Sequence, residues 1–243
     1  MPAVDADSVP PKSDKKTLRV LLTGFGPFRN VEVNPSWLAV SKLNNQTLTF
    51  TPPPDPPSKP HAPKPKPRVP VEAHISALEV PVTYSAVMST IPPLHASKQY
   101  DVMLHVGVGL PGGLEIERQA HKTGYNQQDA DGNFCDRVDE GKHAKRGFGK
   151  GFETFGDEIK TKVDVDGVVQ HLQSLGLKST TPSNDPGRYL CDYIYFCSLA
   201  CAQKEGGRVK VLFMHVPPEG VPYSVEDMTR AVKGIVEYYA LNA

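Results

Sequence analysis

The sequence predicts an α/β fold, a three-layer α/β/α sandwich in which a mostly parallel, twisted sheet lies between helices. Short runs rich in Val, Leu and Ile, such as residues 18–23, 101–108 and 209–216, have the length and composition of buried strands. Segments with apolar residues at helical spacing alternate with these runs, and several runs end at corners rich in glycine or proline. Such alternation places helices on both faces of the sheet.

The first half of the chain begins this pattern. The strand at residues 18–23 ends at the glycine-rich turn of residues 24–28, and Asn34 is suited to cap a helix whose first residue is a proline. A second strand is predicted at residues 74–84, interrupted by Pro81. A helix containing Val87 and Ile91 then leads to the strand at 101–108.

The second half continues the alternation after a long irregular segment. Residues 126–157 are polar and glycine-rich without periodicity, which indicates a functional flap or a mobile loop with no predicted element. The elements predicted after it are a helix at 165–175, a short polar strand at 179–183, a helix at 188–203, a strand at 209–216 and a last helix capped by Ser224.

Composition limits both domain organisation and function. Residues 1–16 and the proline- and lysine-rich residues 52–70 hold too few large apolar side chains to be buried, so we expect a disordered leader and an exposed insertion within one domain at 17–243. The 27 Lys and Arg balance the 27 Asp and Glu, which disfavours nucleic acid and membrane partners. The same charge balance favours a small neutral substrate. With no apolar run near the roughly 20 residues of a membrane span, a cytoplasmic protein is expected.

Candidate chemistry gathers where predicted strands end, because ligands bind beyond the carboxyl ends of the strands in such sheets. Cys191 lies near the start of the helix at 188–203, where unpaired N–H groups and the helix dipole favour a thiolate. Its position alone would favour a packed, inert cysteine. Cys197 and Cys201 share one helix face and are expected to pack, and Cys135 is expected to be a bystander.

Other parts of the sequence offer a candidate base and candidate carboxylates that could act with Cys191. His215 ends a strand and is followed by two prolines, which would hold its imidazole at the sheet edge. Glu115 and Glu117 lie on the same side of an extended segment, and spacing alone does not decide which of them orients an imidazole. His105 is expected to be a structural residue of the core or the surface, and His121 is a candidate neighbour of the site. With no Cys-x-x-Cys pair in the sequence, neither a metal nor a cofactor is expected.

Five segments in this order resemble the pyroglutamyl-peptidase I family, also called pyrrolidone-carboxylate peptidases. They are TGFGPF (23–28), VNPSW (33–37), HVGV with GLEIERQAHKTGY (105–108 and 113–125), DPGRYLCDYIYF (185–196) and FMHVPP (213–218). The resemblance runs from about residue 18 to the last helix, with a break at the insertion.

The resemblance implies a role for each candidate. Cys191 would be the nucleophile, His215 the base and Glu117, rather than Glu115, the supporting acid of a thiol exopeptidase. Its partners would be peptides that begin with pyroglutamate, and the oligomeric state stays undecided between monomer and homo-oligomer. The substrate-binding residues implied are Phe25 and Phe28, which would flank the lactam ring, and Asn34, which would fix their loop.

Two other classes of function remain as alternatives. A nucleotide-binding α/β protein could use residues 24–27 as a phosphate loop, although Pro27 lacks an N–H group and the G-x-G-x-x-G spacing is absent. A family member without turnover could instead act as a binder through the proline-rich insertion.

Overall fold

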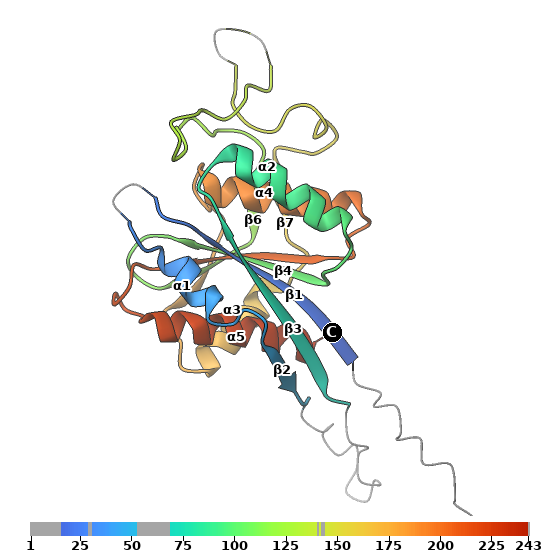
Figure 1. The fold of residues 1–243 in the computed structure, drawn as a ribbon, viewed down its shortest axis with the longest axis vertical. Coiled ribbons are helices and arrows are strands. Elements are labelled where there is room, and N and C mark those ends of the chain that lie inside the picture. Colours follow the sequence, from blue (N-terminus) through green and yellow to red (C-terminus); the bar gives the residue numbers. More distant parts are fainter. Residues whose placement is uncertain (1–15, 29–30, 53–68, 140, 142–143, 243) are drawn as a thin grey trace, which may run out of the picture.

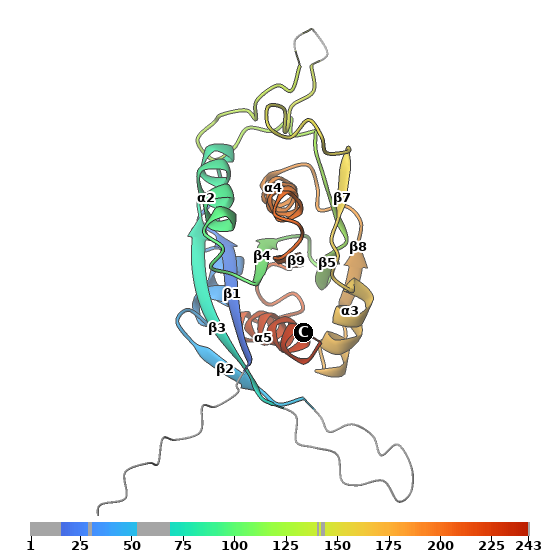
Figure 2. The same cartoon turned by 90° about the vertical axis from the view of Figure 1, so that its right-hand side faces the viewer.

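The computed structural model describes residues 16–28, 31–52, 69–139, 141 and 144–242. A seven-stranded sheet lies between two layers of helices, with α2 and α4 on one face and α1, α3 and α5 on the other (Figures 1 and 2). The predicted α/β/α sandwich is therefore confirmed. Residues 1–15 of the expected leader and residues 53–68 of the insertion lie outside the described residues.

The sheet has the strand order β2-β3-β1-β4-β9-β5-β8. Its strands are β1 (Lys16–Phe25), β2 (Thr47–Phe50), β3 (Val71–Val80), β4 (Val102–Val108), β5 (Leu114–Glu117), β8 (Thr180–Ser183) and β9 (Lys210–Val216). The central strands β3, β1, β4 and β9 run parallel, as does β8 with β5. The edge at which β1, β4 and β9 end is called the carboxyl edge below.

Two hydrophobic clusters fill the space between the sheet and its helices. The helices are α1 (Pro35–Ser41), α2 (Tyr84–Ala96), α3 (Val165–Ser174), α4 (Leu190–Lys204) and α5 (Val225–Leu241). Val20 and Leu22 of β1 face the cluster beneath α1, α3 and α5, whereas Leu21 and Phe25 face the cluster beneath α2 and α4. A strand buried on both faces in this way must be apolar throughout, which is the pattern that made β1 predictable.

The predicted capping residues hold their helices. The Asn34 side chain accepts a hydrogen bond from the N–H of Ser36 at the start of α1. Ser224 and Asp227 form a capping box at the start of α5. Among the described residues, no helix combines the length and apolar character needed to span a membrane.

Some elements differ from those expected. β3 begins at Val71 and ends before Pro81, because proline cannot donate to the ladder beyond that point. The short edge strand β2 carries little periodicity and was not predicted. β6 (Gln119–His121) and β7 (Glu158–Lys160) form a separate two-stranded antiparallel sheet that was also not predicted.

The orientation of β5 differs from a uniformly parallel sheet. Residues 109–113 link β4 to β5, and five residues are too few for the crossover that parallel strands require. β5 therefore runs antiparallel to β9, with Glu115 opposite His215 and Glu117 opposite Phe213. Glu117 accordingly lies level with Phe213, two residues further from the carboxyl edge than His215.

The described residues between 126 and 157 run over the outer side of the α2–α4 layer (Figures 1 and 2). They contain no helix or strand among the residues described there, only isolated bridges such as Gln128 with Phe134. The buried side chains of Cys135, Phe148 and Phe152 nevertheless join the cluster beneath this segment, and the Phe148 ring stacks on Tyr193 of α4 at 4.2 Å between centroids. The segment is thus anchored to α4 by side chains.

Candidate active site

Cys191 occupies the second position of α4 and lies over the carboxyl end of β4. A Cβ atom added to Gly107 would lie 2.7 Å from Cys191 Sγ and 2.8 Å from Cζ of Phe213. Real side chains do not tolerate such contacts, so only glycine lets the sulfur come this close to the sheet. β4 and β9 pair with Gly107 beside His215, which brings the thiol next to the imidazole.

The start of α4 provides a favourable place for an anion. Tyr189, the N-cap residue, makes no side-chain cap hydrogen bond. The first N–H groups of a helix have no intrahelical acceptor, and the helix dipole adds positive potential there. An anion in contact with these N–H groups would therefore be stabilised.

His215 and Glu117 form a buried hydrogen-bonded pair. The distance between His215 Nδ1 and Glu117 Oε1 is 2.8 Å, and the two residues are 7% and 0% exposed. Pro217 follows directly after β9 and ends the strand, which keeps the imidazole at the carboxyl edge. The second oxygen, Glu117 Oε2, has no hydrogen-bond partner among the described residues.

The electrostatic environment favours the charged form of His215. Burial by itself lowers its pKa, but the charge of Cys191, a hydrogen bond to Cys191 and the hydrogen bond and charge of Glu117 outweigh it and raise the pKa to about 10. At neutral pH the imidazole is therefore protonated beside the sulfur. Nδ1–H then donates to Glu117, which leaves the other ring nitrogen for chemistry.

Glu115 and Glu117 share one face of β5, as alternation predicted. Glu117 is fully buried and bonds to the imidazole, whereas Glu115 is half-buried. Ligand atoms of Glu115, Glu117 and His215 lie within 4.8 Å of one another, a spacing that could surround a cation. The direct bond between Nδ1 and Oε1 accounts for this cluster, because a cation there would have to replace that bond.

The turn at residues 24–28 is held by Asn34. Its Nδ2 donates to the carbonyl of Gly26 at 3.0 Å, while its Oδ1 accepts from the Ser36 hydroxyl at 2.8 Å. Ser36 Oγ in turn accepts from the N–H of Phe25 at 3.0 Å. A Cβ atom on Gly24 would lie 2.6 Å from Cα of Trp37, so the turn packs directly on α1. The structure thus brings Asn34 and this turn together, as expected.

Phe25 and Phe28 differ in their surroundings. Phe25 is 4% exposed and belongs to the cluster beneath α2 and α4. Since Thr23 pairs with His105, Phe25 lies at the level of Gly107 on the neighbouring strand. Phe28 is partly buried, and its ring packs against Tyr189 at 5.4 Å between centroids. Both aromatic residues therefore belong to the same end of the molecule as Cys191.

The remaining cysteines are buried. Cys197 and Cys201 pack in the apolar cluster of α4, as their spacing predicted. Cys135 was expected in a flexible stretch but is 1% exposed, and burial raises the pKa of its thiol to about 12. Cys191 is the one partly exposed thiol of the four, which favours it over the others as a nucleophile.

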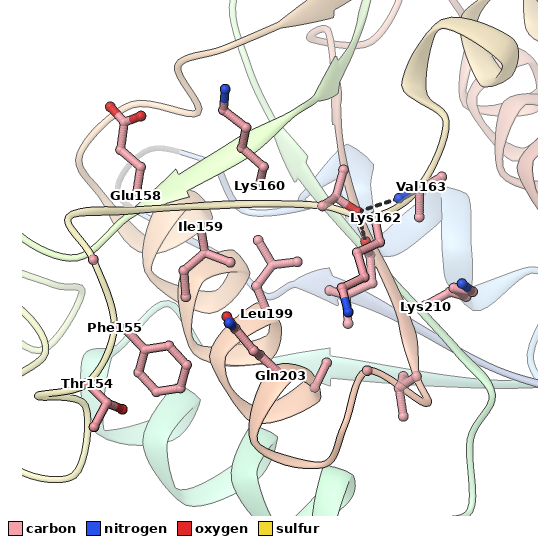
Figure 3. Close-up of a pocket in the computed structure, with 16 residues that line it drawn as sticks. Thr154, Phe155, Glu158, Ile159, Lys160, Lys162, Val163, Leu199, Gln203 and Lys210 are labelled. Carbon is pink, nitrogen blue, oxygen red and sulfur yellow. Dashed lines mark hydrogen bonds between the residues drawn. The ribbon is translucent and has the colours of Figure 1, made fainter.

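A separate cavity of about 300 Å³ lies at the opposite end of α4 (Figure 3). Ile159 of β7 points toward Leu199 of α4 there, while Glu158 and Lys160 extend to the other side of the strand. Leu199 is eight residues beyond Cys191, which places it roughly 12 Å along the helix axis. None of the residues that line this cavity belongs to the predicted site.

Sequence reasoning missed two residues close to Cys191, namely Gly107 and Asp192. Gly107 was predicted within the strand at 101–108, but no role beside Cys191 was assigned to it. Asp192 follows the cysteine in the sequence, and its carboxylate bonds to His121, which was considered only as a neighbour of the site. The 71 residues that separate this pair leave no local pattern from which their contact could be read.

Comparisons with known proteins identify the family of this chain. A family model described as pyroglutamyl peptidase matches residues 18–51 and 57–231. Pyroglutamyl-peptidase 1 of Rattus norvegicus is 33% identical over 224 residues, which cover 90% of this chain and 88% of that protein. Pyrrolidone-carboxylate peptidase of Staphylococcus aureus is 27% identical over 213 residues, 84% of this chain and 82% of that protein.

Solved structures share the fold. Pyrrolidone carboxyl peptidase from Fervidobacterium islandicum AW-1 has a TM-score of 0.70 and 24% identity, with 91% of this chain and 98% of that chain covered. A mutant pyrrolidone carboxyl peptidase from Pyrococcus furiosus has a TM-score of 0.72 and 20% identity, with coverage of 93% and 99%. From the family model and the rat relative together, the chain belongs to the pyroglutamyl peptidase family.

Proposed function

We propose that this chain is a cysteine exopeptidase that removes N-terminal pyroglutamate, or 5-oxoproline, from peptides. The observation that supports it most directly is the cluster of Cys191, His215 and Glu117 at the carboxyl edge, in a chain of the pyroglutamyl peptidase family. Residues 17–243 would act as one catalytic domain.

The reaction follows from the order of these groups. The Cys191 thiolate attacks the carbonyl carbon of the peptide bond that follows pyroglutamate. The C–N bond of that peptide breaks as His215 gives its proton to the leaving amine. Water then attacks the thioester and gives a proton to His215, and the C–S bond breaks to release 5-oxoproline. Glu117 holds the imidazole and stabilises its charge, while N–H groups at the start of α4 stabilise the oxyanion.

Recognition of the lactam would fall to the turn at residues 24–28. A flat, uncharged ring is well held between aromatic faces, which suits Phe25 and Phe28, with Asn34 fixing the turn that carries them. Hydrogen bonds to the lactam amide would exclude proline, whose ring lacks the carbonyl.

The nucleotide-binding alternative finds no support in the turn. The N–H of Phe25 donates to Ser36 Oγ and that of Gly26 donates to the carbonyl of Val80, each at 3.0 Å. Pro27 has no N–H group. These three positions therefore cannot cradle a phosphate.

Release of 5-oxoproline from a pyroglutamyl dipeptide tests the proposed function. Matched dipeptides that begin with proline or glutamate serve as controls, because each lacks part of the lactam amide. We expect rapid release from the pyroglutamyl peptide and at least about 10⁴-fold lower kcat/KM for the other two, since an unpaired polar group in the site is costly. Equal cleavage of all three would contradict the proposal.

The pH dependence of kcat/KM is expected to report His215. Its pKa of about 10 predicts loss of activity as the pH rises through that value. Glu117→Gln removes one of the groups that raise this pKa, so the alkaline loss should move to lower pH. The charged imidazole stabilises the fold fully below its ordinary pKa of 6.5, and this contribution is lost as the pH rises to about 10.

Glu115→Gln is the matched control for this measurement, because Glu115 lies on the same face of β5 without the bond to Nδ1. The pH at which kcat/KM of Glu115→Gln falls on the alkaline side should stay close to that of the wild type. An unchanged alkaline loss of activity in Glu117→Gln would show that Glu117 does not raise the pKa of the His215 imidazole.

A further inference from the structure

We propose that Asp192 and His121 are a positioning pair that holds Cys191 in register with Glu117. This inference rests on the proposed function, in which those two residues act together through His215. The pair would not touch the substrate. It would act by joining the element that carries the nucleophile to the segment that carries the acid.

The attachment has two points. Asp192 follows Cys191 directly and is 0% exposed. Its Oδ1 accepts from the backbone N–H of His121 at 2.8 Å, and its Oδ2 lies 3.0 Å from His121 Nδ1. Arg188 Nη1 approaches Oδ2 at 3.4 Å. Two contacts to the same residue fix both the distance and the orientation of the first turn of α4.

His121 lies on β6, four residues after Glu117. The hydroxyl of Tyr195, one turn beyond Cys191, donates to the backbone carbonyl of Glu117 at 2.9 Å. The segment from Glu117 to His121 is therefore tied to α4 at both of its ends. Bonds between two rigid elements at two places remove both sliding and rotation between them.

His121 is itself held from other directions. The Tyr125 hydroxyl donates to its carbonyl, and its Nε2 lies 3.5 Å from Glu158 Oε1 on β7. Through these contacts the position of Asp192 is fixed by β6 and β7 together, rather than by packing of α4 alone. The short two-stranded sheet thereby gains a role in placing the thiol.

The helix dipole favours an acidic residue in the first turn of α4, but two other electrostatic effects oppose one at this position. A carboxylate next to Cys191 opposes formation of the thiolate, and burial raises the pKa of Asp192 because it disfavours the charged form. The bonds from His121 and the charge of Arg188 counter that cost. The Asp192 carboxylate therefore serves to position Cys191 rather than to stabilise the charge of its thiolate.

Asp192→Ala and Asp192→Asn test the pair, with Asp227→Asn as the matched control at the same position of α5. We expect kcat to fall about 10²-fold in Asp192→Ala with KM nearly unchanged, because a shift of about 1 Å in a reacting group has this effect. Asp192→Asn keeps one oxygen for the His121 N–H and should lose about 10-fold. Asp227→Asn should keep the wild-type kcat.

Iodoacetamide alkylation of Cys191 separates positioning from charge and requires no peptidase activity. If the pair positions the thiol, Asp192→Ala moves the pH of half-maximal alkylation upward, because the sulfur leaves the imidazolium. If Asp192 acts by charge alone, the midpoint moves downward, which would overturn the proposal. Wild-type kcat in folded Asp192→Asn would also overturn it, and this variant decides the question if Asp192→Ala does not fold.

The result is distinguishable from failure of the proposed function. A wild-type protein that releases no 5-oxoproline would refute the peptidase proposal, whereas the alkylation midpoints of the variants would still show whether Asp192 positions the thiol.

Discussion

Replacing Cys191 with alanine is expected to lower kcat for pyroglutamyl peptides by about 10⁴-fold or more while leaving the fold intact. The variant keeps the start of α4 and the turn at residues 24–28 but has no atom that can form the proposed acyl intermediate. Alanine fits where the partly exposed cysteine stands, so the thermal unfolding midpoint should change little. Release of 5-oxoproline and circular dichroism measure the two effects on the same sample.

Cys201→Ala is the control for this variant. Cys201 lies on the same helix and is 8% exposed, but it packs in the apolar cluster away from His215. The Cys201→Ala substitution should lower the free energy of unfolding and leave kcat near the wild-type value. Substantial activity in Cys191→Ala would show that another group attacks the substrate.

Gly107→Ala is expected to lower kcat about 10²-fold, although glycine carries no chemistry. The added methyl group would lie 2.7 Å from Cys191 Sγ and 2.8 Å from the Phe213 ring, so one of them must move. The ring is held in a packed cluster, whereas the sulfur lies at a partly exposed helix start, so the sulfur should shift away from His215. Steady-state kinetics and the rate of alkylation by iodoacetamide should decline together.

Gly156→Ala provides the matched comparison. The nearest atom to a Cβ at Gly156 is the Glu158 carbonyl oxygen at 3.8 Å, an ordinary contact. Activity close to wild type is expected there. If Gly107→Ala were equally active, the close approach of sulfur to the sheet would have no importance for catalysis.

Local patterns were sufficient for the central sheet. β1, β4 and β9 are apolar on both faces, and their ends were visible as glycine or proline corners, so the positions of Cys191 and His215 near the carboxyl edge could be expected. Helix starts were equally readable, because Asn34 and Ser224 form hydrogen bonds that depend only on neighbouring residues.

Contacts between residues far apart in the sequence could not be predicted from such local patterns. Residue alternation showed that Glu115 and Glu117 share a face, but the choice between them depends on the antiparallel register of β5 with β9. The sequence resemblance, rather than physical reasoning, favoured Glu117. The bonds between Asp192 and His121 depend on how α4 lies against β6, which no pattern within either segment encodes.

The described residues between 126 and 157 keep their positions without a backbone ladder. Aromatic rings such as Phe148 and Phe152 fasten them to the helices below, while the stretches between these fixed points bond mostly within themselves. Insertions and deletions in those stretches should therefore be tolerated during evolution, whereas loss of a ring would weaken the attachment of the residues around it. Relatives would then differ most in the length of this covering and least in the spacing of its aromatic attachments.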